Sequence, residues 1–320
     1  MKKILSVMIA LLMLCSLCLS MTGCGADDGK YVIGICQYMP HDALDQATQG
    51  FMDALQDILG EDNVTFKEKN ASGEPANCAT IVDGFIAENV DLIMANATPA
   101  LQAAASATST IPILGTSVTD YATALGIQNW TGTVGRNISG TSDLAPLDQQ
   151  AAVIKELFPD AKTVGMIYCS SEPNSLYQIN VIEGYLKDLG YTCQRFAFND
   201  VNDLGTVSEA AALASDVLYV PTDNIAANYP ETIANVIKPL NKPLVAGESS
   251  TCSACGVATL SISYYDLGYA TGEMAAKILT GEADITTMPV QTLSEVQKLY
   301  NADMCEAVGV PIPEGYDPIG

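Results

Sequence analysis

The sequence predicts an α/β fold made of two doubly wound lobes, and two features lead to this prediction. Short apolar or β-branched runs alternate with longer amphipathic stretches along most of the chain, as in parallel sheets that are covered by helices. This alternation occurs twice, and a polar, glycine-rich bridge at residues 129–140 separates the two series. A chain of 320 residues is also too long for one typical domain and about right for two.

The first series contains four expected strands and three expected helices. The strands are expected at residues 31–36, 64–68, 91–95 and 111–114, and the helices at 42–59, 74–89 and 99–109. The helix at 42–59 has the clearest pattern, because Phe51, Leu55 and Leu59 recur at helical spacing on one face.

The second series repeats this pattern. Its strands are expected at residues 163–168, 192–196, 216–220, 243–246 and 256–260, and its helices at 148–158, 175–189 and 226–240. Two more helices are expected at 264–279 and 301–309. Because both series alternate in the same way, we expect two similar lobes, each with a parallel sheet.

The beginning of the chain has the form of a secretory signal. Lys2 and Lys3 are followed by an apolar run at residues 4–19, and small residues then lead into Cys24. The apolar run is shorter than the ~20 residues that a membrane-spanning helix needs, and no positive charges follow it. These features favour a cleaved signal over a membrane anchor.

The residues around Cys24 resemble a bacterial lipobox, in which the cysteine after the cleavage point carries a diacylglyceryl group. Met21 stands where such sequences usually have leucine. We expect a signal peptide at residues 1–23, a lipid on Cys24 and a short tether at residues 24–29. The remainder of the chain would then lie on the outer face of the bacterial cytoplasmic membrane.

The composition excludes some classes of partner. The formal net charge is -23, whereas nucleic-acid binding requires clustered lysine and arginine to neutralise phosphates. The same charge argues against electrostatic docking on anionic lipid. An apolar content of 48% is ample for two hydrophobic cores.

The cysteines do not predict a metal site. Cys252 and Cys255 form a CxxC motif, but there is no second CxxC and no neighbouring histidine, so a zinc site is not expected. A local disulfide between these two residues remains open for a protein outside the cell. We expect no metal and no cofactor.

The residues that follow the expected strands are uniformly small and polar. Such residues are ordinary helix N-caps, but the carboxyl ends of parallel strands are also where α/β proteins bind ligands. Six such loops in two lobes could line one polar cleft. The loops are Gln37, 96–99, 115–117, 170–175, 221–224 and 247–250.

At these loops the chain resembles one known family, the substrate-binding lipoproteins of ABC transporters for tryptophan, tyrosine and related aromatic amino acids. The most specific matches are Ser-Ser-Glu-Pro-Asn-Ser at 170–175 and Pro-Thr-Asp-Asn at 221–224. Further matches lie at 41–45, 96–99 and 259–265. Asp42 stands where this family has proline.

The resemblance implies a type I periplasmic-binding-protein fold, in which three crossovers form a hinge between the lobes. The crossovers would lie near residues 137–142, 261–263 and 286–289. Lobe 1 would comprise residues 30–136 and 264–286, and lobe 2 residues 137–263 and 287–320.

The resemblance also implies a function without catalysis. A monomeric, lipid-anchored receptor would capture a small ligand, most readily an aromatic amino acid, between its lobes. It would then deliver the ligand to an ABC permease with its ATPase. No enzyme activity is expected.

A free amino acid presents a carboxylate, which suits hydroxyl groups and backbone N–H groups at helix starts. Thr98 and Ser117 are the candidates from lobe 1, and Ser171 and Asn174 could close over the ligand from lobe 2. Gln37, directly after the first strand, is a further candidate.

The ammonium group needs a carboxylate, and Asp223 and Glu248 both follow strands. We expect Asp223 to be its partner, because Asp223 lies in a segment that matches the family. An aromatic ring needs stacking partners. Tyr38 is the main candidate, with Tyr264 or Tyr265 as alternatives.

Two other interpretations stay open at this point. The same fold could bind a nucleoside, a sugar or another small molecule. The second interpretation is an exported enzyme. His41 is the only histidine and no G-x-S-x-G motif is present, so a serine hydrolase would depend on His41 alone.

Overall fold

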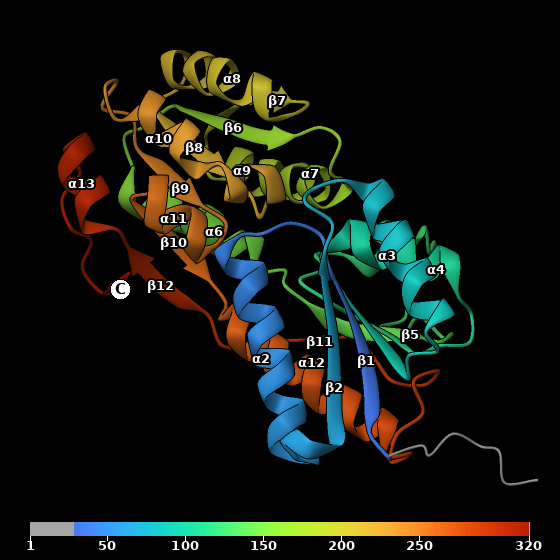
Figure 1. Cartoon of the computed structure of the whole chain (residues 1–320). Helices are drawn as coiled ribbons and strands as arrows, with labels where there is room; N and C mark the ends of the chain where they lie inside the picture. The colour runs from blue at the N-terminus through green and yellow to red at the C-terminus, as the bar shows by residue number, and fades with distance from the viewer. Residues whose placement is uncertain (1–28, 320) are drawn as a thin grey trace, which may run out of the picture. The chain divides into compact units, whose positions relative to one another are not determined.

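The computed structural model describes residues 29–319, and the expected signal peptide and Cys24 lie outside this range. Residues 31–320 form one compact unit. Its strands make two sheets (Figure 1), with the orders β11-β5-β4-β3-β1-β2 and β13-β12-β10-β9-β8-β6-β7. The sheets define the two lobes, so the predicted α/β architecture is confirmed.

All strand pairs in the first sheet are parallel. The strands are β1 (Tyr31–Gln37), β2 (Val64–Asn70), β3 (Leu92–Asn96), β4 (Ile113–Thr116), β5 (Ile138–Ser142) and β11 (Gln291–Thr292). The first strand lies between the second and the third. The chain therefore reverses its winding direction at β1 and β3, and the carboxyl ends of these strands border a crevice.

The second sheet repeats this arrangement around β6 and β8. Beyond β9 it continues with β10, which pairs antiparallel with β12, and β12 pairs in parallel with the edge strand β13. Its strands are β6 (Thr163–Cys169), β7 (Thr192–Phe198), β8 (Val217–Val220), β9 (Leu244–Ala246), β10 (Ala258–Ser261), β12 (Gln297–Tyr300) and β13 (Asp317–Pro318). The short strands β5, β11, β12 and β13 were not expected from the sequence, because they are polar or only two residues long.

Helices connect the parallel strands. They are α2 (Asp42–Leu59), α3 (Pro75–Ala87), α4 (Thr98–Ala107), α5 (Tyr121–Leu125), α6 (Leu147–Leu157), α7 (Pro173–Asp188), α8 (Val201–Ala214), α9 (Asn224–Asn228), α10 (Pro230–Ile237), α11 (Ser249–Cys255), α12 (Tyr264–Leu279) and α13 (Ala302–Val308). A 3-10 turn, η1 (Glu61–Asn63), precedes β2. The single helix expected at 226–240 is wrong: the chain breaks before Pro230, whose ring cannot continue a helix from the preceding turn.

The strand pairings show where the chain passes between the sheets. Residues 138–142, where the first crossing was expected, form β5 and pair with β4, beyond the expected lobe boundary at residue 137. Residues 291–292, assigned to lobe 2 by the resemblance, pair with β5 in the first sheet. The next strand, β12, pairs in the second sheet.

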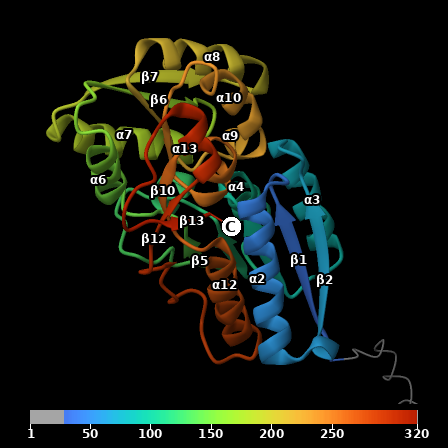
Figure 2. The ribbon, with the colours of Figure 1, turned by 90° about the vertical axis from the view of Figure 1, so that its left-hand side faces the viewer.

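Helices α2 and α12 pack unusually closely (Figure 2). A Cβ atom added to Gly268 of α12 would lie 1.9 Å from the carbonyl oxygen of Ala47. One added to Gly50 of α2 would lie 2.1 Å from the carbonyl oxygen of Tyr265. Only glycine allows this approach. The two glycines therefore let α12 pack against the first lobe, although residues 143–263 separate it from β5 in the chain.

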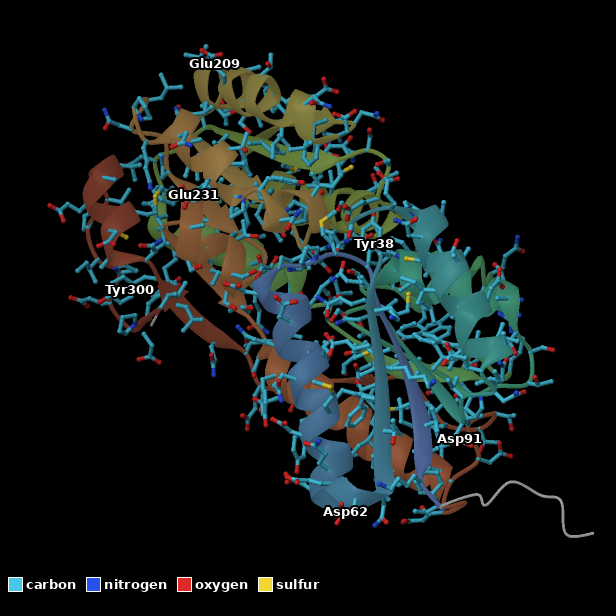
Figure 3. All side chains as sticks on the ribbon, in the orientation of Figure 1. Tyr38, Asp62, Asp91, Glu209, Glu231 and Tyr300 are labelled. Atoms are coloured by element: carbon cyan, nitrogen blue, oxygen red, sulfur yellow. The ribbon has the colours of Figure 1, made fainter. Side chains whose placement is uncertain are left out.

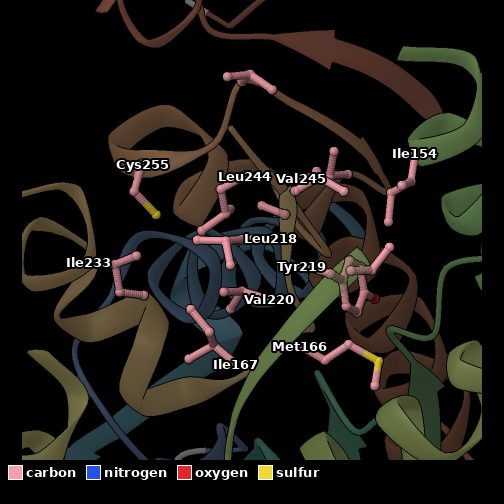
Figure 4. Close-up of a cluster of buried hydrophobic side chains, with 14 of the residues drawn as sticks. Ile154, Met166, Ile167, Leu218, Tyr219, Val220, Ile233, Leu244, Val245 and Cys255 are labelled. Carbon is pink, nitrogen blue, oxygen red and sulfur yellow. The ribbon is translucent and has the colours of Figure 1, made fainter. Parts of the chain in front are cut away.

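Each lobe has its own hydrophobic core. In the second lobe, the β-strand side chains of Met166, Leu218 and Val245 pack against Ile154 and Ile233 of the surrounding helices (Figure 4). In the first lobe, two clusters cover the two faces of the sheet.

Among residues 29–319, none of the helices has the length and apolar character needed to cross a bilayer. The cysteines of the same range are free thiols, and Cys252 and Cys255 are both buried.

Candidate functional site

A small closed cavity lies where the two sheets face each other. Its wall comes from loops that follow β1, β4 and β5 of the first sheet and β6, β8, β9 and β10 of the second. The space open to the centre of a water molecule is about 10 Å³, close to the room that a single water needs. The lining residues are His41, Ala43, Leu44, Ser117, Thr119, Asp143, Asn174, Thr222, Asp223, Asn224, Ala227, Glu248 and Tyr264.

Four of the lining residues carry buried polar atoms without a hydrogen-bond partner in the described part of the chain. They are both ring nitrogens of His41, Ser117 Oγ, Asp143 Oδ1 and Asn174 Oδ1. A buried polar atom that lacks a partner costs about 1–3 kcal/mol, and native proteins keep few of them. Their concentration in one cavity indicates a place where another molecule supplies the missing partners.

The backbone at Ser117 supports this interpretation. Ser117 follows β4 with a φ of 53°, in the left-handed region that non-glycine residues seldom adopt. Its side chain is nearly fully buried, and its hydroxyl group is one of the atoms without a partner. Backbone strain of this kind is typical of binding sites.

Asp223 and Glu248 line the cavity, but both act as helix N-caps. Asp223 Oδ1 accepts from the backbone N–H of Ala226 at 3.0 Å, and Oδ2 accepts from that of Cys169 at 2.7 Å. Glu248 accepts from the backbone N–H groups of Thr251 at 2.5 Å and Ser250 at 2.6 Å, one at each carboxylate oxygen. Each oxygen of these two carboxylates therefore already has a partner.

Asp143 differs from these two acids. It lies directly after β5, and its Oδ2 accepts from the Tyr264 hydroxyl at 3.0 Å, while Oδ1 has no partner among residues 29–319. Burial raises the pKa of Asp143 to about 6, although hydroxyl groups of Thr119 and Tyr264 oppose the shift. Burial and the nearby Glu172 raise the pKa of Asp223 to about 7.

The cavity wall is acidic. It contains the carboxyl groups of Asp143, Asp223 and Glu248 and no lysine or arginine. Burial lowers the pKa of His41, although neighbouring acids such as Glu248 oppose the shift. A wall of this composition favours a ligand with a positive charge and disfavours a phosphate or sulfate.

Glu172 orders the lobe 2 side of the cavity from behind. Its Oε2 accepts from the backbone N–H and the side-chain amide of Asn224, at 3.0 and 2.7 Å, and from the amide of Asn174 at 3.0 Å. Glu172 is itself almost completely buried. These bonds leave Asn174 Oδ1 free, so that the amide presents an acceptor without a partner.

The structure places the predicted site residues in three different environments. Ser117, Asn174, Asp223 and Glu248 line the closed cavity. Tyr38 and Ser171 instead line a neighbouring groove of about 830 Å³. Figure 3 shows Tyr38 in the loop between β1 and α2, and its hydroxyl group donates to the carbonyl oxygen of Gly73 at 2.8 Å.

Gln37 and Thr98 line neither space. The Gln37 amide donates to Asp45 at 2.5 Å and accepts from Thr48 at 2.6 Å, inside the first lobe. Thr98 is buried in the first turn of α4. Of the two alternatives for a stacking partner, Tyr264 reaches the cavity, whereas Tyr265 is 37% exposed and donates to Asp53 at 2.9 Å.

Sequence reasoning did not select two of the residues with partnerless atoms, His41 and Asp143. His41 lies in the family-like segment 41–45 and is the only histidine of the sequence, but nothing in its position predicts a binding role. Asp143 follows β5, a strand of sequence Ile-Ser-Gly-Thr-Ser that has no apolar alternation. Without a recognised strand, the residue after it could not be identified as a strand-end residue.

Comparisons with known proteins give a consistent result. The chain is 34% identical over 323 residues to a tyrosine-binding protein of Clostridioides difficile (strain R20291), covering 96% of this chain and 92% of that protein. A structure from Streptococcus pneumoniae, described as an ABC domain in complex with L-Trp, has a TM-score of 0.82 and 32% identity, over 88% of this chain and 96% of that one.

A third similar protein is a substrate-binding protein with adhesive properties from Clostridium difficile, in a ligand-free, open structure. It has a TM-score of 0.71 and 33% identity, over 90% of this chain and 99% of that one. At nearly equal identity, the present structure is thus more similar to the L-Trp complex than to the open form.

The match to a family of known proteins spans almost the whole described chain. Residues 32–316 match the sequence model of the ABC transporter substrate-binding proteins. Both the two-lobed fold and the cavity between the sheets agree with this match. The chain therefore belongs to the family of ABC transporter substrate-binding proteins.

Proposed function

We propose that this substrate-binding protein captures an aromatic L-amino acid, such as tyrosine or tryptophan, between its lobes, with residues of the cavity wall as its contacts. The observation that carries the proposal is the combination of partnerless polar atoms with buried carboxyl groups in that cavity. An α-amino acid brings one cationic group and one group that accepts hydrogen bonds. The cationic group would supply the positive charge that the cavity wall lacks, and the accepting group would pair with donors that have no partner there.

Relatives support the choice of an aromatic side chain. The similar proteins from Clostridioides difficile and Streptococcus pneumoniae are described as binding tyrosine and L-Trp. In this chain, Tyr264 and Leu44 contribute ring and aliphatic surface to the cavity, and Tyr38 lies in the neighbouring groove. We infer that an aromatic ring packs among these side chains, as ring faces pack on apolar and aromatic surface.

The predicted site residues enter this proposal with different roles. Ser117 and Asn174 face the ligand directly with free polar atoms. Asp223 and Glu248 supply negative potential while they cap α9 and α11. Ser171, in the groove, contacts a ligand on its way in, whereas Gln37 holds α2 through Asp45 and Thr48 and has no ligand contact in this proposal. Thr98, buried at the start of α4, has none either.

The proposal extends to where the protein works. Substrate-binding proteins of ABC transporters act outside the cytoplasm and deliver their ligand to a permease. We propose that this protein is a monomer anchored through a lipid on Cys24, and that it catalyses no reaction. Mass spectrometry of the protein extracted from membranes should show a diacylglyceryl mass on an N-terminal Cys24; a retained Met1 would contradict the anchor.

Ligand binding can be tested with the protein expressed from residue 25 onward, without signal peptide or lipid. Thermal shift against the twenty standard amino acids, followed by calorimetry, should give saturable binding of tyrosine, tryptophan or phenylalanine. Nucleosides and simple sugars serve as comparison ligands. Binding of a nucleoside or sugar, with no response to any amino acid, would contradict the proposal.

A further inference from the structure

The ammonium group of an amino acid is best received by a carboxylate oxygen that has no other donor. Three carboxyl groups line the cavity, and their hydrogen bonds distinguish them. All four oxygens of Asp223 and Glu248 accept from backbone N–H groups. An ammonium group at either residue would compete with the helix caps, which are worth about 1 kcal/mol each.

Asp143 alone among the three has a free oxygen. Its Oδ1 is buried, lines the cavity and lacks a partner in the described part of the chain. Its Oδ2 is held by the Tyr264 hydroxyl, so the side chain is already oriented. The residue is 3% exposed, and a charge–charge contact at such a site is little screened by solvent.

We propose that Asp143 is the ammonium receptor of the amino-acid site, in place of Asp223. This inference rests on the proposed function. Asp143 also connects β5 with α12 through its hydrogen bond to Tyr264. Asp143 follows β5, where the chain leaves the first sheet, and Tyr264 begins α12, where the chain returns to it. An ammonium group bound at Asp143 Oδ1 therefore contacts the hinge region directly.

The same reasoning explains why a ligand must supply the positive charge. Asp143 faces Glu248 from the start of α11 and Tyr264 from α12, and Asp223 and His41 line the same cavity. None of these groups is a lysine or arginine. A bound ammonium group offsets this negative potential, and ionised Asp143 binds it more tightly than neutral Asp143 does.

The test compares an amino acid with its analogue that lacks the amino group. L-tyrosine is paired with 3-(4-hydroxyphenyl)propanoate, and L-tryptophan with indole-3-propanoate. Wild-type protein should bind the amino acid at least tenfold more tightly than the analogue, the scale of losing a hydrogen bond to a charged group. Asp143→Asn should lose at least tenfold in affinity for the amino acid and keep its affinity for the analogue, so that the preference disappears.

Matched variants separate this role from general damage to the fold. Asp91→Asn changes an exposed aspartate that precedes the amino end of β3, away from the cavity. Asp91 accepts from the backbone N–H of Val32, and the variant should keep the wild-type preference. Asp223→Asn and Glu248→Gln should lower the melting temperature through their caps, and should reduce the preference for the amino acid less than Asp143→Asn does. Preference lost in Asp223→Asn but retained in Asp143→Asn would overturn the inference.

A second variant covers the case in which Asp143→Asn does not fold. Tyr264→Phe removes the hydroxyl group that donates to Oδ2 and helps to keep Asp143 ionised. The pH below which amino-acid affinity declines should therefore be higher in Tyr264→Phe than in wild type. An identical pH profile in both proteins would overturn the inference. If wild-type protein binds none of the twenty amino acids, the proposed function itself is contradicted, and the role of Asp143 falls with it.

Discussion

At the scale of single residues, the protein keeps two aspartates in places where ionisation is unfavourable. Asp143 and Asp223 are both almost completely buried, and their pKa values lie near 6 and 7. Burial is the largest cause for each. The negative potential of the cavity is thus maintained at a cost to the ligand-free protein, which a cationic ligand can offset.

This leads to a prediction about stability and pH. A carboxyl group with a raised pKa in the folded state binds its proton more tightly when folded, so its contribution to stability is lost as pH rises. For Asp143, a shift from 3.8 to about 6 corresponds to about 3 kcal/mol at most. The contribution of Asp143 to the free energy of unfolding of the ligand-free protein, measured with urea, should therefore fall between pH 4 and pH 7.

The variant Asp143→Asn isolates this contribution from the other titrating groups. Its free energy of unfolding should fall less steeply between pH 4 and pH 6 than that of wild type, whereas Asp91→Asn should retain the wild-type slope. Equal slopes in wild type and Asp143→Asn would show that Asp143 titrates near its ordinary pKa.

At the scale of elements, the helix pair α2 and α12 joins a late segment of the chain to the first lobe. The backbones meet at Gly50 and Gly268, where an added Cβ atom would collide with carbonyl oxygens. Glycine in a helix interior is intrinsically unfavourable by about 1 kcal/mol relative to alanine. Its presence here is explained by the close approach of the two helices.

The corresponding prediction concerns Gly268→Ala. The new methyl group lies 1.9 Å from the carbonyl oxygen of Ala47, so the helices must shift, and we expect a loss of about 1–3 kcal/mol in the free energy of unfolding. Gly184→Ala in α7 is the matched control, because nothing lies within 4 Å of its added Cβ atom. The control should stabilise the protein by up to about 1 kcal/mol. Equal effects of the two variants would contradict the packing argument.

At the scale of the whole molecule, the cavity is closed too tightly to admit a ligand. Its free space of about 10 Å³ is close to the room that one water molecule needs. The structure is also more similar to an L-Trp complex than to a ligand-free open structure. Both observations indicate that lobe separation must precede ligand entry, as in hinge closure of other two-lobed receptors.

We therefore expect the ligand-free protein to be more extended in solution than the complex. Small-angle X-ray scattering should show a smaller radius of gyration after addition of saturating tyrosine or tryptophan, because ligand contacts from both lobes favour the closed state. Asp143→Asn, at the same amino-acid concentration, should show a smaller change. A radius of gyration that does not respond to a bound amino acid would exclude closure as the response.

Much of the fold could be predicted from local sequence. The expected helices 42–59 and 264–279 coincide with α2 and α12, because both carry apolar residues at helical spacing over many turns. β5 and β11 were missed, since a short polar strand is recognisable only from its partner in the sheet. The break before Pro230 was also missed, although proline is a strong local signal.

The candidate site was predictable in part. Ser117, Asn174, Asp223 and Glu248 were identified because they follow strands, and the carboxyl ends of parallel strands meet at one edge. Tyr38 and Ser171 follow strands as well, but face the neighbouring groove. Position after a strand therefore locates the cleft without specifying which side chains reach its closed part.

The sequence by itself determined the class of fold, the two lobes and the family of the protein, because alternation and loop composition are local properties. Only the tertiary structure decided which acid is free to bind a ligand. The backbone N–H of Cys169 occupies Asp223 Oδ2 across a separation of 54 residues, and Tyr264 orients Asp143 across 121. Hydrogen bonds between residues so far apart in the chain depend on how the sheets face each other, and no local sequence pattern predicts that arrangement.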